Sequence, residues 1–288
     1  MLALAKNIVT LDKAEELLEE VLIVNNASTM DYSMLREFIS TVPHINFRYI
    51  DSPENLGVAR GRNYAIEQSS APFLIMLDDD AEMGNKDCLV NLVDEFSKKE
   101  GKRKVAVISF KVLYFQTSEM QVNAFPHKQF ERYKDKHHFL TYYYAGGAHA
   151  IRKEVFDQLG KYPEDFFYGM EEYDLGYRIV EAGYSIVYSD RIVMLHKESP
   201  QGRKTKKEKQ AMMWLNKSKV AWRYLPLPYF VSTAFLWSLE YLKKTRFDII
   251  GWFRGLISVF RIPAQEKRKP LSATSLAYLR ETEARLWY

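Results

Sequence analysis

Short apolar runs alternate with amphipathic segments over the first part of the chain. Bulky, uncharged runs at 21–24, 73–77 and 105–110 are typical of buried strands. Strands that alternate with helices of about ten residues indicate βαβ units, so we expect an α/β fold with a mostly parallel sheet flanked by helices. The expected helices cover 4–20, 34–42, 58–68, 88–99, 153–159 and 171–182, and further strands cover 46–50, 186–188 and 192–195.

Two interruptions break this alternation. Residues 115–139 mix Tyr, Phe, His and Lys without a period, and we interpret them as an irregular insertion with an antiparallel strand pair. The small residues at 145–148 then break the chain before the helix at 153–159. The alternating pattern stops near residue 200, so residues 1–200 are expected to form one domain.

The charge changes where the pattern stops. Residues 1–196 hold 22 Lys and Arg against 30 Asp and Glu, whereas residues 197–288 hold 19 against 7. The resulting net charges of −8 and +12 mark two parts with different surroundings. The single cysteine, Cys88, excludes an internal disulfide framework and fits a reducing compartment.

The basic C-terminal part is also apolar. Residues 224–239 carry no charge over sixteen positions, fewer than the roughly 20 that a membrane-spanning helix needs. Aromatic and aliphatic residues then recur at helical spacing over 249–260, beside arginines. Such helices are typical of an interfacial membrane anchor, so we expect residues 201–288 to be an amphipathic helical region that binds an anionic membrane surface. A helical subdomain packed on the first domain is the alternative, and no nucleic acid is expected, because bulky apolar surface serves no purpose against phosphate.

An aspartate triplet, Asp78-Asp79-Asp80, follows the apolar run at 73–77. Side chains at i and i+2 of a strand point to the same side, so Asp78 and Asp80 are expected to converge beyond the carboxyl end of the sheet. Two carboxylates at such a point suit Mg²⁺ or Mn²⁺. The alternative is an acidic loop that caps the following helix.

Three further features accompany the triplet. A turn that contains Asn55 and Arg62 runs into a helix start, which suits an anion such as a diphosphate, although Asn and Gly also form ordinary turns. The acidic run 171–174 opens an expected helix and offers a rigidly held general base, although first helical turns are often acidic for dipole reasons alone. His196 ends an expected strand, and a lone histidine is most often structural.

These features belong to a series of motifs in a fixed order. The series is Asn25-Asn26-Ala-Ser-Thr29, Asn55-x-Gly57 with Arg62-Asn63, Leu77-Asp-Asp-Asp80, Gly146-Gly147 with Arg152-Lys-Glu154, Glu171-Glu-x-Asp174-Leu and a late histidine. Over roughly residues 3–200 it resembles glycosyltransferase family 2, and most of all bacterial, rhamnosyltransferase-like enzymes that build surface polysaccharides. The resemblance implies a GT-A fold with a Rossmann-like nucleotide-sugar domain, an inverting reaction and a divalent metal, Mg²⁺ or Mn²⁺.

The resemblance also implies roles for individual residues. Asp80 and His196 would ligate the metal, with Asp78 beside the metal or the donor ribose. The metal would screen the donor diphosphate and stabilise the leaving charge as a Lewis acid. Glu172 would be the catalytic base that takes the proton of the acceptor hydroxyl. Further donor contacts would come from Asn25, Asn55, Arg62, Asp78, Asp79 and Gly147, whereas Gly146, Glu171 and Asp174 would shape the site or meet the acceptor.

The chain departs from the family pattern at three places. Members usually begin with a strand whose loop touches the nucleotide base, whereas Met1 falls directly in the helix that follows, so we expect a late start or an incomplete donor pocket. Asn25 stands where an aspartate often contacts the base. Glu172 stands for the usual aspartate and is one methylene longer, a change that still permits base catalysis.

The motifs and the charge split together give one expectation and one rival. We expect a nucleotide-diphosphate sugar donor, a lipid-linked or glycan acceptor, and a peripheral position on the cytoplasmic face of the cell membrane; homo-oligomerisation stays open. The rival is a catalytically inactive, membrane-associated scaffold of a glycan assembly complex. A sugar nucleotidyltransferase or an aspartate-nucleophile phosphatase would need N-terminal motifs that the sequence lacks.

Overall fold

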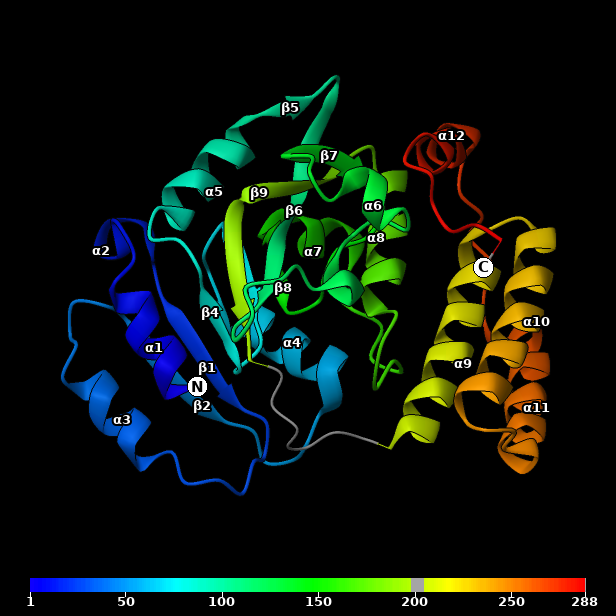
Figure 1. Cartoon of the computed structure of the whole chain (residues 1–288), viewed down its shortest axis with the longest axis horizontal. Coiled ribbons are helices and arrows are strands. Elements are labelled where there is room, and N and C mark those ends of the chain that lie inside the picture. The colour runs from blue at the N-terminus through cyan, green and yellow to red at the C-terminus, as the bar shows by residue number, and fades with distance from the viewer. Residues whose placement is uncertain (198–204, 288) are drawn as a thin grey trace.

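Strands and helices follow one another up to His196, and over residues 14–77 they alternate as the hydrophobic pattern predicts (Figure 1). The computed structural model describes residues 1–197 and 205–287. In chain order, its first elements are α1 (Leu2–Val9), α2 (Ala14–Leu17), β1 (Val21–Asn25), α3 (Ser33–Ser40), β2 (Phe47–Asp51), α4 (Gly57–Gln68), β3 (Phe73–Leu77), β4 (Ala81–Met83), α5 (Cys88–Ser97), β5 (Lys99–Glu100), β6 (Arg103–Tyr114), the 3-10 turn η1 (Val122–Ala124), α6 (Phe130–Tyr133), β7 (His138–Thr141), β8 (Ala148–Arg152), α7 (Lys153–Leu159), α8 (Glu171–Glu181) and β9 (Ser185–His196).

The strands form two sheets. β1 and β2 pair in parallel as a sheet of their own, while β3, β8, β6, β9 and β4 lie in that order in a larger sheet, with β5 on β6 and β7 on β9. Among the described pairs of the larger sheet, β6–β9 is parallel and the others are antiparallel. The sheet is thus mixed, where a mostly parallel one was expected, because several of its connections are turns or loops rather than crossover helices.

Several elements differ from the sequence-based expectation, which contained neither β4 nor β8. The helix expected over 4–20 is two helices, because Lys13, with a left-handed φ of 57°, interrupts it before α2. The two short strands expected near 190 are one strand, β9, whose pairing with β6 shifts register between Phe110 and Lys111. The insertion at 115–139 contains η1 and α6 and pairs with β6 through a single bridge, Leu113 to Met120.

Apolar cores lie on both faces of the larger sheet. Successive residues of β6 alternate between them: Val107 packs with α4, α7 and α8, whereas Ile108 packs with α2 and α5. The sheet with its helices on both faces is therefore a rigid support for the loops at the ends of β3, β8 and β9.

In the part of the chain that the structure describes, four helices follow β9. They are α9 (Lys206–Tyr224), α10 (Leu227–Lys244), α11 (Ile249–Gln265) and α12 (Ala273–Glu281). The first three pack around Trp214, Tyr241 and Ile262, and α9 lies beside α8 (Figure 1). Helix α12 returns to the first domain, where the Tyr278 hydroxyl donates to the carbonyl of Thr141 at 2.8 Å. Over the described residues, no helix has both the length and the apolar character required to cross a membrane.

Candidate active site

A cavity of about 210 Å³ lies where the chain leaves β3 and enters β8. Asp78, Gly146, Gly147 and His196 line it, as does Gln121 from the insertion. Four of these five residues belong to the motifs found in the sequence. The fold thus brings motifs that are far apart in the chain to one point.

The aspartate triplet lies in a turn and not on the strand. β3 ends at Leu77, and the amide of Ala81 closes the turn by donating to the carbonyl of Asp78 at 3.1 Å. The i, i+2 alternation of a strand therefore does not apply to Asp78 and Asp80. Oδ1 of Asp78 is 3.7 Å from Nη2 of Arg62, whereas Oδ1 of Asp80 is 3.3 Å from Nε2 of His196, so the two carboxylates have different partners.

Asp80 and His196 form the pair that could share a cation. Oδ1 of Asp80 is 3.3 Å from Nε2 of His196, and both side chains are largely buried, with 17% and 20% of their surface exposed. The other ring nitrogen, Nδ1, is 2.8 Å from Oε1 of Gln121. The backbone holds the pair together as well, because the amide of Lys197 donates to the carbonyl of Asp80 at 2.9 Å.

The chemistry of this pair fits a divalent ion that arrives with a diphosphate. Among the described residues, no group of three or more His, Cys, Asp or Glu side chains is arranged to hold a metal. Mg²⁺ is commonly bound by one or two carboxylates, with substrate phosphates and water completing its shell. Asp80 supplies one such carboxylate, the neighbouring Nε2 of His196 could add a nitrogen ligand, and Asp78 lies on the wall of the cavity that His196 also lines.

Glu171 and Glu172 share the guanidinium of Arg62. Nη1 of Arg62 donates to Oε1 of Glu171 at 3.0 Å and to Oε1 of Glu172 at 3.2 Å. Burial favours the neutral form of Arg62, but the carboxylates of Glu171, Glu172 and Asp78 outweigh it and raise the pKa of Arg62 above its usual value. Burial, and next the charge of Glu172, raise the pKa of Glu171 to about 8, so near neutral pH Glu171 is mainly protonated.

The two glycines let the backbone approach these carboxylates. A Cβ on Gly146 would lie 1.9 Å from Oε1 of Glu172, and a Cβ on Gly147 would lie 2.2 Å from Oδ2 of Asp78. Neither distance is tolerable for a side-chain carbon. The absence of a side chain at both positions therefore leaves room for the carboxylates of Glu172 and Asp78 beside these two residues of the cavity wall.

The remaining predicted donor residues lie at the edge of the site. Asn25 donates from Nδ2 to Oδ1 of Asp51 at 2.9 Å, and Oδ1 of Asn55 accepts from the amide of Gly57 at 2.9 Å. The carbonyl of Asp79 accepts from the amino group of Met1 at 2.8 Å, and Met1 directly precedes α1, as expected.

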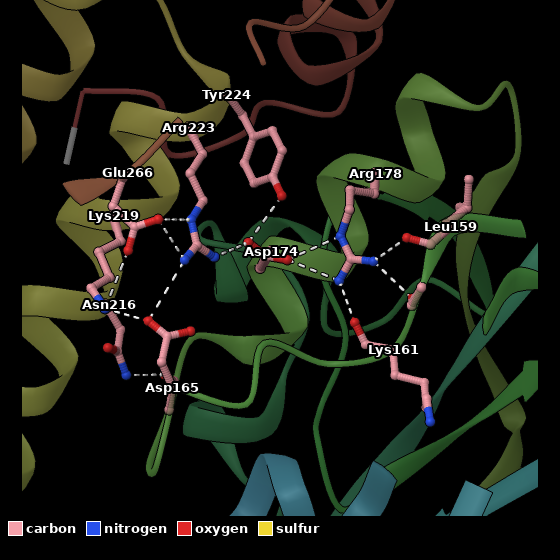
Figure 2. Close-up of polar contacts among 12 residues, drawn as sticks. Leu159, Lys161, Asp165, Asp174, Arg178, Asn216, Lys219, Arg223, Tyr224 and Glu266 are labelled. Atoms are coloured by element: carbon pink, nitrogen blue, oxygen red, sulfur yellow. Dashed lines mark hydrogen bonds and ion pairs between the residues drawn. The ribbon is translucent and has the colours of Figure 1, made fainter. Parts of the chain in front are cut away.

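Asp174 lies between Arg178 of its own helix and Arg223 and Tyr224 of α9 (Figure 2). Its Oδ2 accepts from Nη1 of Arg223 at 2.8 Å and from the hydroxyl of Tyr224 at 3.0 Å, while its Oδ1 is 2.9 Å from Nη2 of Arg178. Asp174 therefore ties α8 to α9 and does not line the cavity.

Sequence reasoning missed Gln121 and the partners of Arg62. Gln121 stands in a segment without periodicity, and nothing near it in the sequence marks it as a neighbour of His196. The expectation for Arg62 was a donor phosphate, whereas in the structure the guanidinium contacts three carboxylates. Acidic residues at 171 and 172 were the available signal for a cationic partner.

Comparison with known proteins identifies related sequences. A family model described as glycosyl transferase family 2 matches residues 3–160, more than half of the chain. A protein of Haemophilus influenzae (strain ATCC 51907 / DSM 11121 / KW20 / Rd), described as uncharacterized, is 30% identical over 146 residues, which are 51% of this chain and 77% of that protein. The family match confirms the resemblance read from the motifs.

Solved structures share the fold at low sequence identity. GalNAc-T7 with UDP, GalNAc and Mn²⁺ aligns with a TM-score of 0.61 and 18% identity over 93% of this chain, which spans 55% of the GalNAc-T7 chain. TarS 1–349 of S. aureus in complex with UDP-GlcNAc aligns with a TM-score of 0.59 and 15% identity. The alignment covers 90% of this chain and 76% of the TarS chain. Mannosyltransferase PcManGT from Pyrobaculum calidifontis, in complex with GDP-Man and Mn²⁺, aligns with a TM-score of 0.54 and 17% identity. The alignment covers 99% of this chain and 76% of the PcManGT chain. These likenesses show a GT-A glycosyltransferase fold.

Proposed function

The chain belongs to glycosyl transferase family 2, and from this premise we propose that it moves a sugar from a nucleotide-diphosphate sugar to a lipid-linked or polysaccharide acceptor, with inversion at the anomeric carbon, in bacterial surface glycan synthesis. The observation that carries the proposal is that Arg62 holds the carboxylate of Glu172 at 3.2 Å, directly beside Gly146, a residue of the cavity wall. A carboxylate held there can receive a proton beside the place where a donor sugar would lie.

Glu172 acts as the general base in this proposal. The acceptor hydroxyl oxygen attacks the anomeric carbon, its proton passes to the carboxylate of Glu172, and the bond from that carbon to the diphosphate oxygen breaks. Arg62 fixes the position of Glu172, whose side chain is only 15% exposed. Burial, and next the charge of Glu172, raise the pKa of Glu171, so this pair of carboxyl groups retains a proton near neutral pH.

Asp80 and His196 would hold the divalent ion, Mg²⁺ or Mn²⁺, with Asp78 close to it. When bound, the ion would stabilise the negative charge that develops on the leaving diphosphate. Gly147 would let the donor approach the backbone beside Asp78. The nucleotide part of the donor would contact Asn25, Asn55 and Asp79. The carboxylate of Asp51, which accepts from Asn25, adds a further polar group beside this proposed contact.

Transfer assays with Glu172→Gln test the proposed function. We expect transfer with Mn²⁺ and a panel of sugar nucleotides to fall about 10²–10⁴-fold, because the amide cannot take the proton. Glu37→Gln, an exposed position on α3, is the matched control and should keep the wild-type rate. Equal rates for wild type and Glu172→Gln would remove Glu172 from its role, and no turnover with any sugar nucleotide would favour the inactive scaffold.

A peripheral membrane position is the second part of the proposal. Among the described residues, ten of the twenty exposed large apolar side chains lie between 227 and 260. They follow the outer faces of α10 and α11, including Val231, Phe235, Phe253 and Phe260, while Trp214 and its neighbours fill the inner side. An outer face of this kind suits the interface of a membrane.

The charges around these helices favour an anionic lipid surface. Each of the three acidic residues of segment 225–272 is ion-paired: Glu240 with Lys244, Asp248 with Lys207, and Glu266 with Arg223. Exposed basic side chains remain at the same helices, such as Lys243, Arg246, Arg254 and Arg261. A basic rim around an apolar face complements anionic headgroups.

Vesicle flotation tests the membrane position. We expect the full chain to float with vesicles that contain phosphatidylglycerol and not with phosphatidylcholine alone, and Phe235→Ser with Phe260→Ser to abolish flotation. Met34→Ser, at an exposed apolar residue of α3, is the control. Substitution is preferable to deletion of residues 200–288, because α9 and α12 fill part of the first domain's core. Unchanged flotation of the double variant would refute membrane binding by this face. The same conclusion would follow if the two substitutions left flotation unchanged but converted a wild-type dimer into a monomer.

A further inference from the structure

Gln121 lies against His196 although it belongs to none of the family motifs. Its amide oxygen is 2.8 Å from Nδ1 of His196, and Nε2 of the same ring is 3.3 Å from Oδ1 of Asp80. We propose that Gln121 is a positioning residue of the metal site, which holds His196 in the tautomer whose Nε2 can bind a divalent cation together with Asp80. This inference deepens the proposed function and rests on its metal-dependent chemistry.

The partner of Nδ1 decides which ring nitrogen can bind a cation. An amide oxygen only accepts hydrogen bonds, so Nδ1 of His196 must carry the proton that Gln121 receives. In neutral imidazole, Nε2 then has the lone pair that a metal ion requires. Metal-binding histidines commonly donate their second N–H to an outer oxygen in this way, and Gln121 supplies such an oxygen.

Asp80 favours a positive charge next to the same nitrogen. With Nε2 as an acceptor, this nitrogen and Oδ1 of Asp80 are two electron-rich atoms 3.3 Å apart, so a positive charge beside both would lower their mutual repulsion. Asp80 and His196 would hold a divalent cation together, because both atoms belong to groups that bind such ions.

The backbone around Gln121 keeps its amide in place. Its N–H donates to the carbonyl of Val112 at 2.9 Å, and its carbonyl accepts from the amide of Ala124 at 3.1 Å. The residue is only 6% exposed. On the other side, the carbonyl of His196 accepts from the amide of Phe115 at 3.0 Å. Both partners are thus anchored to β6 or its immediate continuation, and the irregular insertion gains a specific role.

Rotation of the Gln121 amide gives the opposite arrangement. If the amide nitrogen faced Nδ1, it would donate to the ring, and Nε2 would carry the proton and donate to Asp80. That pair would be satisfied without a cation, and a metal would have to displace the proton. The two arrangements differ in the protonated ring nitrogen and in the response to substitution at position 121.

Substitution at position 121 separates the two arrangements. Gln121→Met removes the amide at similar length, and Gln121→Glu keeps only acceptor oxygens. We expect Gln121→Met to weaken Mn²⁺ binding about 10–100-fold, measured by Mn²⁺ electron paramagnetic resonance with and without inorganic pyrophosphate, and Gln121→Glu to bind at least as tightly as wild type. Asn123→Asp, which adds a charge to the same cavity wall, is the matched control and should not reproduce the effect of Gln121→Glu.

The tautomer provides a second readout that needs no metal. Nitrogen-15 NMR of histidine-labelled, metal-free wild type, with His196→Gln to assign the signal, should show Nδ1 of His196 protonated. Nδ1 without a proton, or equal Mn²⁺ affinity of wild type and a folded Gln121→Met, would overturn the role of Gln121 while leaving the proposed function standing. Failure of the wild type to bind Mn²⁺ with pyrophosphate would overturn the metal part of the proposed function as well, whereas loss of transfer in Glu172→Gln would still support base catalysis.

Discussion

Replacement of Arg62 by methionine is expected to destabilise the protein in a pH-dependent way. Arg62 is 15% exposed and lies 3.0 Å from Glu171, 3.2 Å from Glu172 and 3.7 Å from Asp78. Methionine preserves much of the aliphatic stem but removes the guanidinium. The variant would leave Glu171, only 2% exposed, and Glu172 without their cationic partner.

The size of the loss follows from the state of the two carboxyl groups. Removing one partner of a buried ion pair costs about 3–5 kcal/mol. At about pH 6 the pair retains a proton, because burial raises the pKa of Glu171 to about 8, so we expect the lower end of this range, about 3 kcal/mol. Without Arg62 the pKa of Glu171 rises further. Above about pH 8 the native variant therefore retains a proton that the native wild type releases. The difference in free energy of unfolding between wild type and variant then widens toward about 5 kcal/mol.

Urea unfolding at about pH 6 and about pH 9 measures the loss of unfolding free energy in Arg62→Met at each pH. Arg60→Met is the matched control on the same helix, because Arg60 pairs with Glu54 at the surface, at 2.8 Å with side chains 45% and 63% exposed. Such pairs contribute about 0–1 kcal/mol. A loss in Arg62→Met no larger than in Arg60→Met, or equal losses at the two pH values, would refute the reasoning.

Three further results are expected. Gly147→Ala should abolish transfer, because a Cβ there would lie 2.2 Å from Oδ2 of Asp78. Gly61→Ala should be tolerated, because its added Cβ would lie 3.4 Å from the nearest atom. Equal transfer rates for the two variants would contradict the close approach of Asp78 to Gly147. The free energy of unfolding should fall between about pH 4.5 and pH 8, because over that range the native state keeps the Glu171 proton and the unfolded chain does not; Glu171→Gln should flatten this fall in urea titrations. EDTA should stop transfer and Mn²⁺ restore it, and Asp80→Asn should need far more Mn²⁺ for the same rate; transfer that resists EDTA would exclude the metal.

Elements decided by neighbouring residues could be predicted from the sequence. The strand expected at 73–77 has those bounds in the structure, and α8 begins at Glu171 as the acidic run indicated. An uncharged run and a charged first turn are local signals, and they specify local structure. The family motifs added the order in which the segments would meet.

Partners far apart in the sequence could not be predicted in the same way. Arg62 meets Glu171 and Glu172 across 109 and 110 positions, and Gln121 meets His196 across 75. Hydrophobic periodicity shows which face of an element is buried, but it carries no information about the residue opposite. The antiparallel pairing of β8 is a similar case, because a loop and not a helix leads into that strand.

Helix α8 connects the proposed base to the C-terminal helices. Glu172 stands in its first turn, and Asp174, two positions on, accepts hydrogen bonds from Arg223 and Tyr224 of α9 (Figure 2). Asn216, also on α9, donates to the carbonyls of Tyr168 and Gly169 just before the helix. The change in charge near residue 197 thus separates two kinds of surface and not two mechanical units. Helix α8, which carries Glu172, is therefore held by contacts from both parts of the chain: Arg62 on one side and α9 on the other.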